Sequence, residues 1–389
     1  MKSKNNLEKT AVVYWPFSIF RDIHLKKDIG SIPLSFRDRG YETTLIVGEF
    51  LATDIFGVNI YETENSHYKI MNPLSQAMEF IKVMKKLLRL SPDIEITYNR
   101  NPFFPLVMAL YKFTNIFKFN KKHKTKFIIK MDSDGDFRFT NFPSHFLEET
   151  YFYRVLNIST TVMLDLNHIF SDYISIESEC GLEKIKKILR KVEKLVVIPN
   201  GCASSYFVDS NKEVPKKENV TLSVSRVARQ KSLETLIEAF AQISSAFPDW
   251  SVIIVGEIED QSYYEELVKL TEKVGLYNRV NFEGTVSQEK LQELYSKSSI
   301  FCLPSNWESD SISRREALAA GLPLITTEAG CGQSLEKYGS IVVPIGDSTS
   351  LASGLARLMS DVNLREEISE SQKRALISWD DVVDRFINL

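Results

Sequence analysis

The sequence is poor in cysteine, with four among its 389 residues. Cys180, Cys202, Cys302 and Cys331 form no C-x-x-C pair. A disulfide scaffold needs more cysteines, and a zinc site needs cysteines and histidines at closer spacing. We therefore expect neither in this protein.

The sequence also lacks a long apolar run and an excess of positive charge. No segment reaches the roughly 18 uninterrupted apolar residues that a helix needs to span a bilayer. The first residues, MKSKNNLEKTAVVYWPF, have neither the apolar stretch nor the cleavage site of a secretory signal. The net charge of -3 gives no overall basic character, which nucleic-acid-binding proteins usually show. We therefore expect a cytoplasmic protein that does not bind nucleic acid.

The length and composition indicate two folded domains. Hydrophobic residues make up 43% and charged residues 25% of the chain, as in ordinary globular proteins. A chain of 389 residues exceeds what one hydrophobic core usually supports. Two domains leave room for a ligand site in each or between them.

Short apolar runs alternate with amphipathic stretches along the whole chain, which predicts parallel sheets with helices on both faces. In the first domain a helix is expected over residues 32–39, after a loop at 28–31 that presents backbone N–H groups. A polar segment with a proline, residues 211–219, predicts the linker to the second domain. The strands expected before it are residues 10–14, 43–47, 93–97, 126–130, 160–164 and 195–198.

The second domain repeats this alternation. Its expected strands are residues 220–224, 251–255, 280–283, 300–303 and 324–326. Its expected helices are residues 233–245, 288–296 and 313–320. The fold class predicted for both domains is therefore α/β.

Two glutamates stand eight positions apart after a strand of the second domain. Glu308 falls in the loop past residues 300–303, and Glu316 falls one turn inside the next helix. A helix N-terminus offers free N–H groups to a pyrophosphate, and carboxylates accept hydrogen bonds from sugar hydroxyls. The alternative is structural: Glu316 favours the first turns of its helix, and Glu308 is solvated. The two glutamates alone do not decide between these.

Two cations follow an earlier strand of the same domain. Arg226 and Lys231 lie between residues 220–224 and the next helix, at the edge of a parallel sheet where ligands bind. A guanidinium fork and an ammonium point charge together can neutralise a diphosphate. The alternative here is a solvated basic loop.

The order of these segments resembles the GT4 family of retaining glycosyltransferases. The resemblance covers about 140 residues and includes two further segments, Val255-Gly256-Glu257 and Phe282-Glu283-Gly284-Thr285-Val286. It implies a GT-B architecture with two facing Rossmann-like domains, residues 1–210 for the acceptor and 211–370 for the nucleotide-sugar donor. Residues 371–389 would form a helix that packs back on the first domain.

Carried over residue by residue, the resemblance implies a donor site. Arg226 and Lys231 would hold the diphosphate, Glu316 the ribose and Glu308 the transferred sugar. The remaining donor-binding positions would be Gly256, Gly284 and Val286 around the base, Ser311 and Ile312 at the helix start, and Gly30 from the first domain.

Two positions depart from the family pattern. Ser309-Asp310-Ser311 replaces a Gly-Phe-Gly turn, so a negative charge stands near the expected diphosphate, and we expect Asp310 to point away from it. Asp132 stands where many relatives have a histidine, and it could bind a donor-sugar hydroxyl or orient the acceptor. A calcium-binding loop of the EF-hand type needs a glutamate at its twelfth position, and this segment has none there. An ordinary turn rich in Asp and Gly remains an alternative.

The predicted reaction transfers the sugar with retention of configuration at its anomeric carbon, and the protein contributes by stabilising the charges that develop. Glu308, Asp132, Arg226 and Lys231 are the expected catalytic residues, and the resemblance requires neither a protein base nor a metal or other cofactor. The rival interpretations are a GT-B nucleotide-sugar epimerase, a phosphorylase and a non-catalytic subunit that binds sugar nucleotides.

The acceptor is expected to be a saccharide or a lipid-linked molecule, in the synthesis of a surface polysaccharide or glycolipid. Residues 81–90 and 111–127 mix lysines with apolar and aromatic side chains. Such segments can rest on an anionic membrane at its inner face, although charge runs are usually just solvated.

Overall fold

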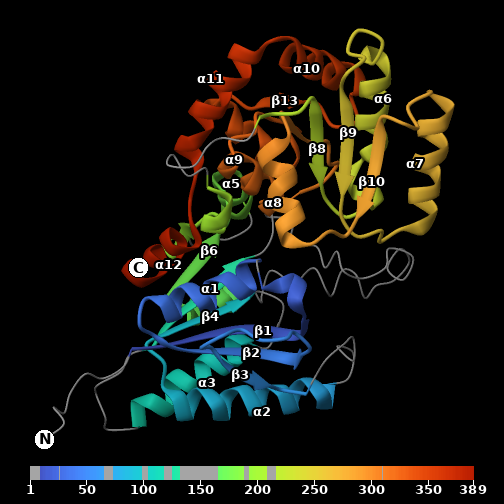
Figure 1. Cartoon of the computed structure of the whole chain (residues 1–389). Coiled ribbons are helices and arrows are strands. Elements are labelled where there is room, and N and C mark those ends of the chain that lie inside the picture. Colours follow the sequence, from blue (N-terminus) through green and yellow to red (C-terminus); the bar gives the residue numbers. More distant parts are fainter. Residues whose placement is uncertain are drawn as a thin grey trace, which may run out of the picture. The chain divides into compact units, whose positions relative to one another are not determined.

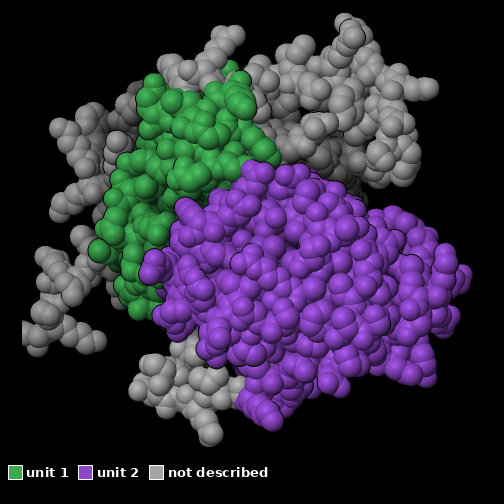
Figure 2. Space-filling view, turned by 90° about the horizontal axis from the view of Figure 1, so that it is seen from above, with its two compact units in different colours: residues 1–200, 379–389 green, residues 201–378 purple. Residues whose placement is uncertain are grey.

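The computed structural model describes residues 9–25, 27–64, 73–98, 104–117, 125–131, 165–187, 192–207, 216–308 and 310–389. The chain divides into two compact units, coloured separately in Figure 2. Unit 1 contains residues 1–200 and 379–389, and unit 2 contains residues 201–378. The divisions thus fall after Asn200 and before Trp379, whereas the sequence analysis placed them after residues 210 and 370. The strand expected at 160–164 lies outside the described residues.

Unit 1 is built on a seven-stranded parallel sheet with the strand order β3-β2-β1-β4-β5-β6-β7 (Figure 1). The order runs outward in both directions from β1 and β4, which is the arrangement of a doubly wound Rossmann-like sheet. The strands are β1 (Thr10–Phe20), β2 (Glu42–Phe50), β3 (Asn59–Glu62), β4 (Ile94–Tyr98), β5 (Lys126–Met131), β6 (Tyr173–Ile176) and β7 (Leu195–Val197).

Helices cover both faces of this sheet, and the alternation of strand side chains determines which core each residue joins. Val12 and Tyr14 of β1 pack in one cluster with α2 (Pro73–Leu90), α3 (Phe104–Phe117) and α5 (Glu179–Lys186). The helix α1 (Asp28–Asp38) lies on the opposite face, as Figure 1 shows. The buried face of α12 (Trp379–Asn388) packs on α1.

The helix α12 is fixed to unit 1 by polar contacts as well as by its apolar face. Arg39 donates to the carboxylate of Asp380 at 2.7 Å and to Asp384 Oδ2 at 2.7 Å. Lys126 Nζ, at the start of β5, donates to the carbonyl of Ile387 at 3.0 Å. The last helix of the chain therefore belongs to the first unit.

The start of α1 differs from the sequence expectation. A loop was expected at 28–31 and a helix only from residue 32. The helix instead begins at Asp28 and contains Gly30. A Cβ at position 30 would lie 2.4 Å from the carbonyl oxygen of His24, so the glycine permits close packing against the preceding turn, η1 (Asp22–His24).

Unit 2 is built on a six-stranded parallel sheet with the strand order β10-β9-β8-β11-β12-β13. This is again the doubly wound arrangement, so the predicted α/β class with parallel sheets is confirmed for both units. The strands are β8 (Val220–Val224), β9 (Ser251–Val255), β10 (Val280–Gly284), β11 (Ile300–Leu303), β12 (Leu324–Thr327) and β13 (Ile341–Val343).

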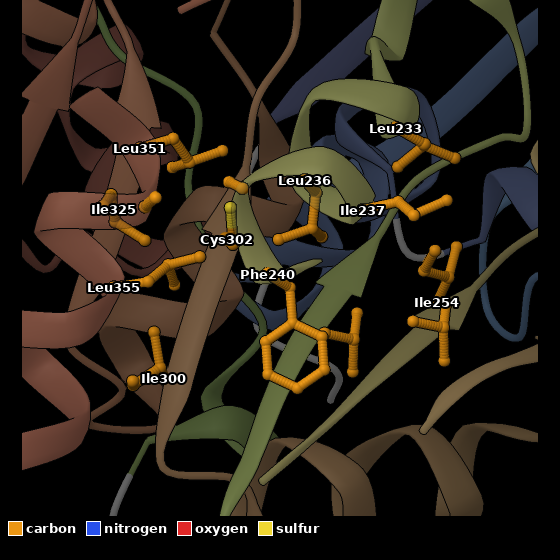
Figure 3. Packing of buried hydrophobic residues seen from close by; sticks show 14 of the residues in the cluster. Leu233, Leu236, Ile237, Phe240, Ile254, Ile300, Cys302, Ile325, Leu351 and Leu355 are labelled. Carbon is orange, nitrogen blue, oxygen red and sulfur yellow. The ribbon is translucent and has the colours of Figure 1, made fainter. Parts of the chain in front are cut away.

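Two cores enclose the sheet of unit 2. On one face α6 (Leu233–Ile243), α7 (Gln261–Lys273) and α10 (Ser348–Ser360) pack on Ile254, Ile300 and Cys302. Figure 3 shows Phe240 and Leu236 of α6 within this cluster. On the other face α8 (Gln288–Lys297) and α9 (Ile312–Ala319) pack on Phe301 and Leu303. The helix α11 (Val362–Gln372) completes the unit.

Candidate functional site

The charged motifs of unit 2 meet at the carboxyl ends of two neighbouring strands. Lys231 follows β8 and Glu308 follows β11, and these strands pair although they are far apart in the sequence. The strand order reverses between β8 and β11, and ligands of doubly wound sheets bind at such a reversal. The fold therefore places both residues where a ligand site is expected.

Hydrogen bonds join the two loops that carry these residues. The backbone N–H of Asn306 donates to the carbonyl of Gln230 at 2.9 Å, and the Gln230 side chain donates to the carbonyl of Trp307 at 3.1 Å. Ser232 adopts a left-handed conformation with a φ of 48° and is the residue that directly precedes α6. This turn ends the short helix η5 (Arg229–Lys231).

Lys231 and Glu308 form a buried ion pair. Lys231 Nζ donates to Glu308 Oε1 at 2.6 Å, and Ser305 Oγ donates to the same oxygen at 2.8 Å. Their side chains are 11% and 7% exposed. Because the surroundings exclude most water, the attraction between these charges is screened less than at the surface.

The pair keeps unused hydrogen-bonding capacity. Both hydrogen bonds to Glu308 fall on Oε1, and within the part of the chain that the structure describes Oε2 accepts none. An ammonium has three donors, and Lys231 uses one of them on Glu308. A ligand with anionic and hydroxyl groups could therefore engage both side chains.

Glu316 lies on α9 and has a different partner. Tyr295 Oη donates to Glu316 Oε2 at 2.9 Å and lies 3.2 Å from the carbonyl of Ser313. Burial and the nearby charge of Glu316 raise the pKa of Tyr295 well above its ordinary value, so this phenol stays a neutral donor. Ser311 caps α9 with its side chain, and Ile312 is the first residue of the helix.

Asp310, the unusual acidic residue of this loop, is paired. Its Oδ2 lies 2.9 Å from Nε and 2.8 Å from Nη2 of Arg315. The neighbouring guanidinium therefore balances the charge that departs from the family pattern. Ser309 lies outside the described residues.

Arg226 pairs with a different carboxylate from the one that Lys231 binds. Its guanidinium is half exposed and binds the carboxylate of Glu259. Among the residues that the structure describes, no contact joins Arg226 to Lys231 or Glu308. An exposed pair of this kind exchanges partners at little cost in free energy.

The two glycines expected near the base lie together. The N–H of Gly256 donates to the carbonyl of Gly284 at 2.8 Å. Gly256 has a φ of 146°, and a Cβ there would lie 2.0 Å from the carbonyl oxygen of Ser225, so only glycine fits. Val286 follows β10 and packs against the core shared with α8 and α9.

Two site residues were expected from the first unit, Gly30 and Asp132. Gly30 is buried in the first turn of α1, and its N–H donates to the carbonyl of Lys27 at 3.1 Å. Asp132 lies outside the described residues, so its expected role stays a prediction.

Arg314 is a buried charged residue that the sequence motifs did not reveal. This residue of α9 is 3% exposed, and its Nη1 donates to the carbonyl of Ala329 at 2.9 Å. Its Nε and Nη2 are buried and have no hydrogen-bond partner among the described residues. One signal was present in the sequence: position 314 shares a helix face with Ala317 and Leu318, which predicts a core position where an arginine is unusual.

Among the described residues, no group of three or more His, Cys, Asp or Glu side chains could hold a metal ion. No helix among them is long and apolar enough to cross a membrane.

The class of protein follows from the comparison with known families. Residues 207–375 match the family model described as "Glycosyl transferases group 1". This stretch covers β8 to β13 and contains both Lys231 and Glu308. This part of the chain, which makes up most of unit 2, is therefore similar to the group 1 glycosyltransferases.

Curated relatives agree with this assignment. An uncharacterized glycosyltransferase of Methanocaldococcus jannaschii is 27% identical over 56% of this chain and 61% of its own length. The alpha-D-kanosaminyltransferase of Streptomyces kanamyceticus is 29% identical over 43% of this chain and 46% of its own length. The matched stretches thus span less than two thirds of these relatives.

Solved structures match nearly the whole chain. HepE of Anabaena, solved with UDP and glucose, has a TM-score of 0.70 at 16% identity, covering 97% of this chain and 98% of its own. The sucrose-phosphate synthase of Thermosynechococcus elongatus has a TM-score of 0.71 at 15% identity, covering 98% of each chain. These likenesses concern the fold, which is the GT-B fold.

Proposed function

We propose that this protein is a retaining glycosyltransferase that moves a sugar from a nucleotide-diphosphate sugar to a saccharide or lipid-linked acceptor. The observation that carries the proposal is the buried pair of Lys231 and Glu308 at the strand reversal of a unit that is similar to the group 1 glycosyltransferases. In this proposal Lys231 and Arg226 hold the diphosphate, Glu308 binds the transferred sugar and Glu316 binds the ribose.

The proposed reaction needs charge stabilisation more than proton transfer by the protein. The bond between the anomeric carbon and the diphosphate oxygen breaks, and the acceptor oxygen bonds to the same face of that carbon. The acceptor proton passes to the leaving diphosphate. Lys231 stabilises the negative charge that develops there, in a surrounding from which most water is excluded. No metal or other cofactor enters this proposal.

The test is to incubate the protein with UDP-, GDP-, ADP- and CDP-sugars and to measure free nucleotide, with and without acceptor lipids and saccharides. UDP-sugars come first, because HepE was solved with UDP and UDP-glucose. We expect acceptor-dependent release from one donor. Binding without release would favour the non-catalytic subunit, and conversion of the sugar without transfer would favour the epimerase.

A matched pair of variants checks that the site is responsible. Glu308→Gln should abolish release. Glu293→Gln should not, because Glu293 forms a pair of similar length with Lys297, 2.7 Å, on the exposed surface of α8. Equal activity of both variants would contradict the proposed site.

We further propose that the acceptor is met at the inner face of an anionic membrane, in surface polysaccharide or glycolipid synthesis. An exposed stripe on α2 supports this, with Met78 and Ile81 followed by Lys85 and Arg89 one and two turns later. Apolar side chains over the interface and cations over head groups suit such a surface. The lysine-rich residues 118–124 lie outside the described part of the chain.

Sedimentation with anionic vesicles tests this surface. The double variant Lys85→Glu and Arg89→Glu should lose most vesicle binding. The double variant Lys273→Glu and Lys290→Glu, which makes the same change of charge at exposed positions of unit 2, should retain it. Equal sedimentation of the two variants would contradict the α2 surface.

A further inference from the structure

Glu316 is held from the interior of unit 2 by a tyrosine that the proposed reaction does not yet use. Tyr295 lies on α8, is fully buried, and donates through its hydroxyl to Glu316 Oε2 at 2.9 Å. Glu316 itself, on α9, is partly exposed. The contact therefore joins a carboxylate that a ligand can reach to a donor that the ligand cannot reach.

Aromatic contacts fix where the hydroxyl of Tyr295 lies. Its ring stacks on Phe301 of β11, with 5.8 Å between the ring centroids, and meets the ring of Tyr206 edge-on at 5.4 Å. Tyr206 ends the short helix η4 (Ser204–Tyr206), and its own hydroxyl accepts from Gln288 Nε2 at 2.5 Å. Tyr295 is thus packed against two other elements of unit 2, which restricts the movement of its hydroxyl.

The donor that Glu316 receives is neutral, whereas Glu308 receives an ammonium. A phenol carries one hydrogen, and the shorter contact of this hydroxyl is to the carboxylate rather than to the Ser313 carbonyl at 3.2 Å. The bond from Tyr295 therefore orients the carboxylate without adding an opposite charge. A carboxylate can accept about four hydrogen bonds, so this bond is compatible with others from the two vicinal hydroxyls of a ribose.

We propose that Tyr295 is a positioning residue that orients Glu316 toward the ribose hydroxyls of the nucleotide. The inference rests on the proposed function, in which Glu316 binds the ribose, and it adds a residue that is itself too buried to touch the ligand. An acceptor that is fixed in advance loses less side-chain freedom on binding, so it binds more tightly than a mobile one. Tyr295 therefore increases the selectivity for nucleotides that carry both ribose hydroxyls.

The test compares equilibrium binding of UDP and of 2′,3′-dideoxy-UDP, which has no hydroxyls on its ribose. The ratio of the two dissociation constants isolates the hydroxyls, because both nucleotides present the same base and diphosphate. The wild type should prefer UDP by about tenfold or more, and Tyr295→Phe, which keeps the ring, should prefer it by about threefold or less. If another nucleoside diphosphate binds in place of UDP, that nucleotide and its dideoxy analogue are compared.

Two controls separate this role from a general effect on stability. Tyr263→Phe removes a similar bond, because Tyr263 of α7 is buried and its hydroxyl donates to the carboxylate of Glu234 on α6. This variant should have a lower Tm but an unchanged preference for UDP. Glu316→Met should abolish the preference, and adding Tyr295→Phe should then have no further effect on it, because the hydroxyl acts through this carboxylate.

The outcomes distinguish the two proposals. An undiminished preference for UDP in Tyr295→Phe overturns the role of Tyr295 alone, and so does an equal loss of preference in Tyr263→Phe. Equal binding of the two nucleotides by the wild type overturns the assignment of Glu316 to the ribose, and this inference with it. Failure to bind UDP, GDP, ADP and CDP overturns the proposed function as a whole.

Discussion

Both sheets of this protein place a lysine against a carboxylate at the carboxyl ends of their strands, but the two lysines have different surroundings. In unit 1, Lys130 lies between Glu177 at 2.6 Å and Asp28 at 2.9 Å, and its side chain is 1% exposed. In unit 2, Lys231 is paired with Glu308 and its side chain is 11% exposed. The same topology therefore produces two kinds of charged cluster.

The difference lies in the charge balance and the exposure of each cluster. In unit 1, Lys130 lies between two carboxylates, Asn200 donates to Glu177 at 3.0 Å, and the ring of Tyr98 lies 5.2 Å from the ammonium. In unit 2, one lysine faces one carboxylate, and both side chains are more exposed than that of Lys130. An inaccessible cluster stabilises a fold, whereas a more accessible one can bind a ligand. Substitutions should therefore affect stability in unit 1 and activity in unit 2.

The largest effect on stability is expected for Lys130→Met. Burial alone would raise the pKa of Asp28, but the charge and hydrogen bond of Lys130 outweigh it and hold that pKa below its usual value. Removing the cation leaves buried carboxylates uncompensated, which should cost about 3–5 kcal/mol of unfolding free energy. Urea denaturation at pH 7 measures this, and the loss should shrink at low pH as the carboxylates protonate. A change below about 1 kcal/mol would contradict a structural role.

The matching change in unit 2, Lys231→Met, should act on turnover. Loss of one preorganised group that stabilises transition-state charge lowers kcat by roughly 10²–10³-fold. The Tm should change less than in Lys130→Met, because removing Lys231 leaves one carboxylate without its cation and removing Lys130 leaves two. Lys297→Met, which breaks an exposed pair, should keep full activity. Normal turnover in Lys231→Met would remove the distinction between the two units.

A third prediction concerns how the stability of the protein depends on pH through a buried carboxyl group of unit 1. Glu95 is fully buried in β4, and burial raises its pKa to about 8, against which the hydrogen bond from Thr97 acts only weakly. The folded state thus holds a proton that the unfolded state releases near pH 4.5. Stability from this group is complete below pH 4.5 and is lost as the pH rises through about 8. The Tm of the wild type should therefore fall across this range more steeply than that of Glu95→Gln. Parallel curves would contradict the burial of an ionisable group there.

The smallest effect is expected where α12 meets α1. Arg39→Ala removes the bonds to Asp380 and Asp384, whose side chains are more than half exposed. Exposed ion pairs contribute little, so the loss should be about 1 kcal/mol or less. The buried face of α12, including Val383 and Phe386, should hold the helix in place. Proteolysis that removes α12 from Arg39→Ala but not from the wild type would show that the ion pairs matter more.

The sequence predicted the central strands of unit 2 well and missed several other elements, among them α7 and α10. The strands expected at 220–224, 251–255 and 300–303 are confirmed at the same residues, because each is a buried run rich in β-branched and apolar residues. The strands β6 and β13 were missed, since three or four residues carry too little periodicity to stand out. Tertiary packing against η1 determined the start of α1, and propensity alone did not reveal it.

The site was predictable only in part. The motifs placed Lys231 and Glu308 at the carboxyl ends of strands, but assigned them to different groups of a ligand. Their ion pair depends on how two loops are joined at Gln230, Asn306 and Trp307, which no local pattern encodes. Arg314 was not predicted, because the motif on α9 indicated Glu316 and not Arg314 as a ligand-binding residue.

The most direct test of the proposed donor site is equilibrium binding of UDP, or of another nucleoside diphosphate if UDP does not bind, to the wild type, Lys231→Met and Lys297→Met. We predict that the wild type and Lys297→Met bind equally and that Lys231→Met binds at least about tenfold more weakly, a difference of about 1.4 kcal/mol. Equal binding by all three proteins would contradict the account, because the buried lysine of unit 2 would then not hold the diphosphate.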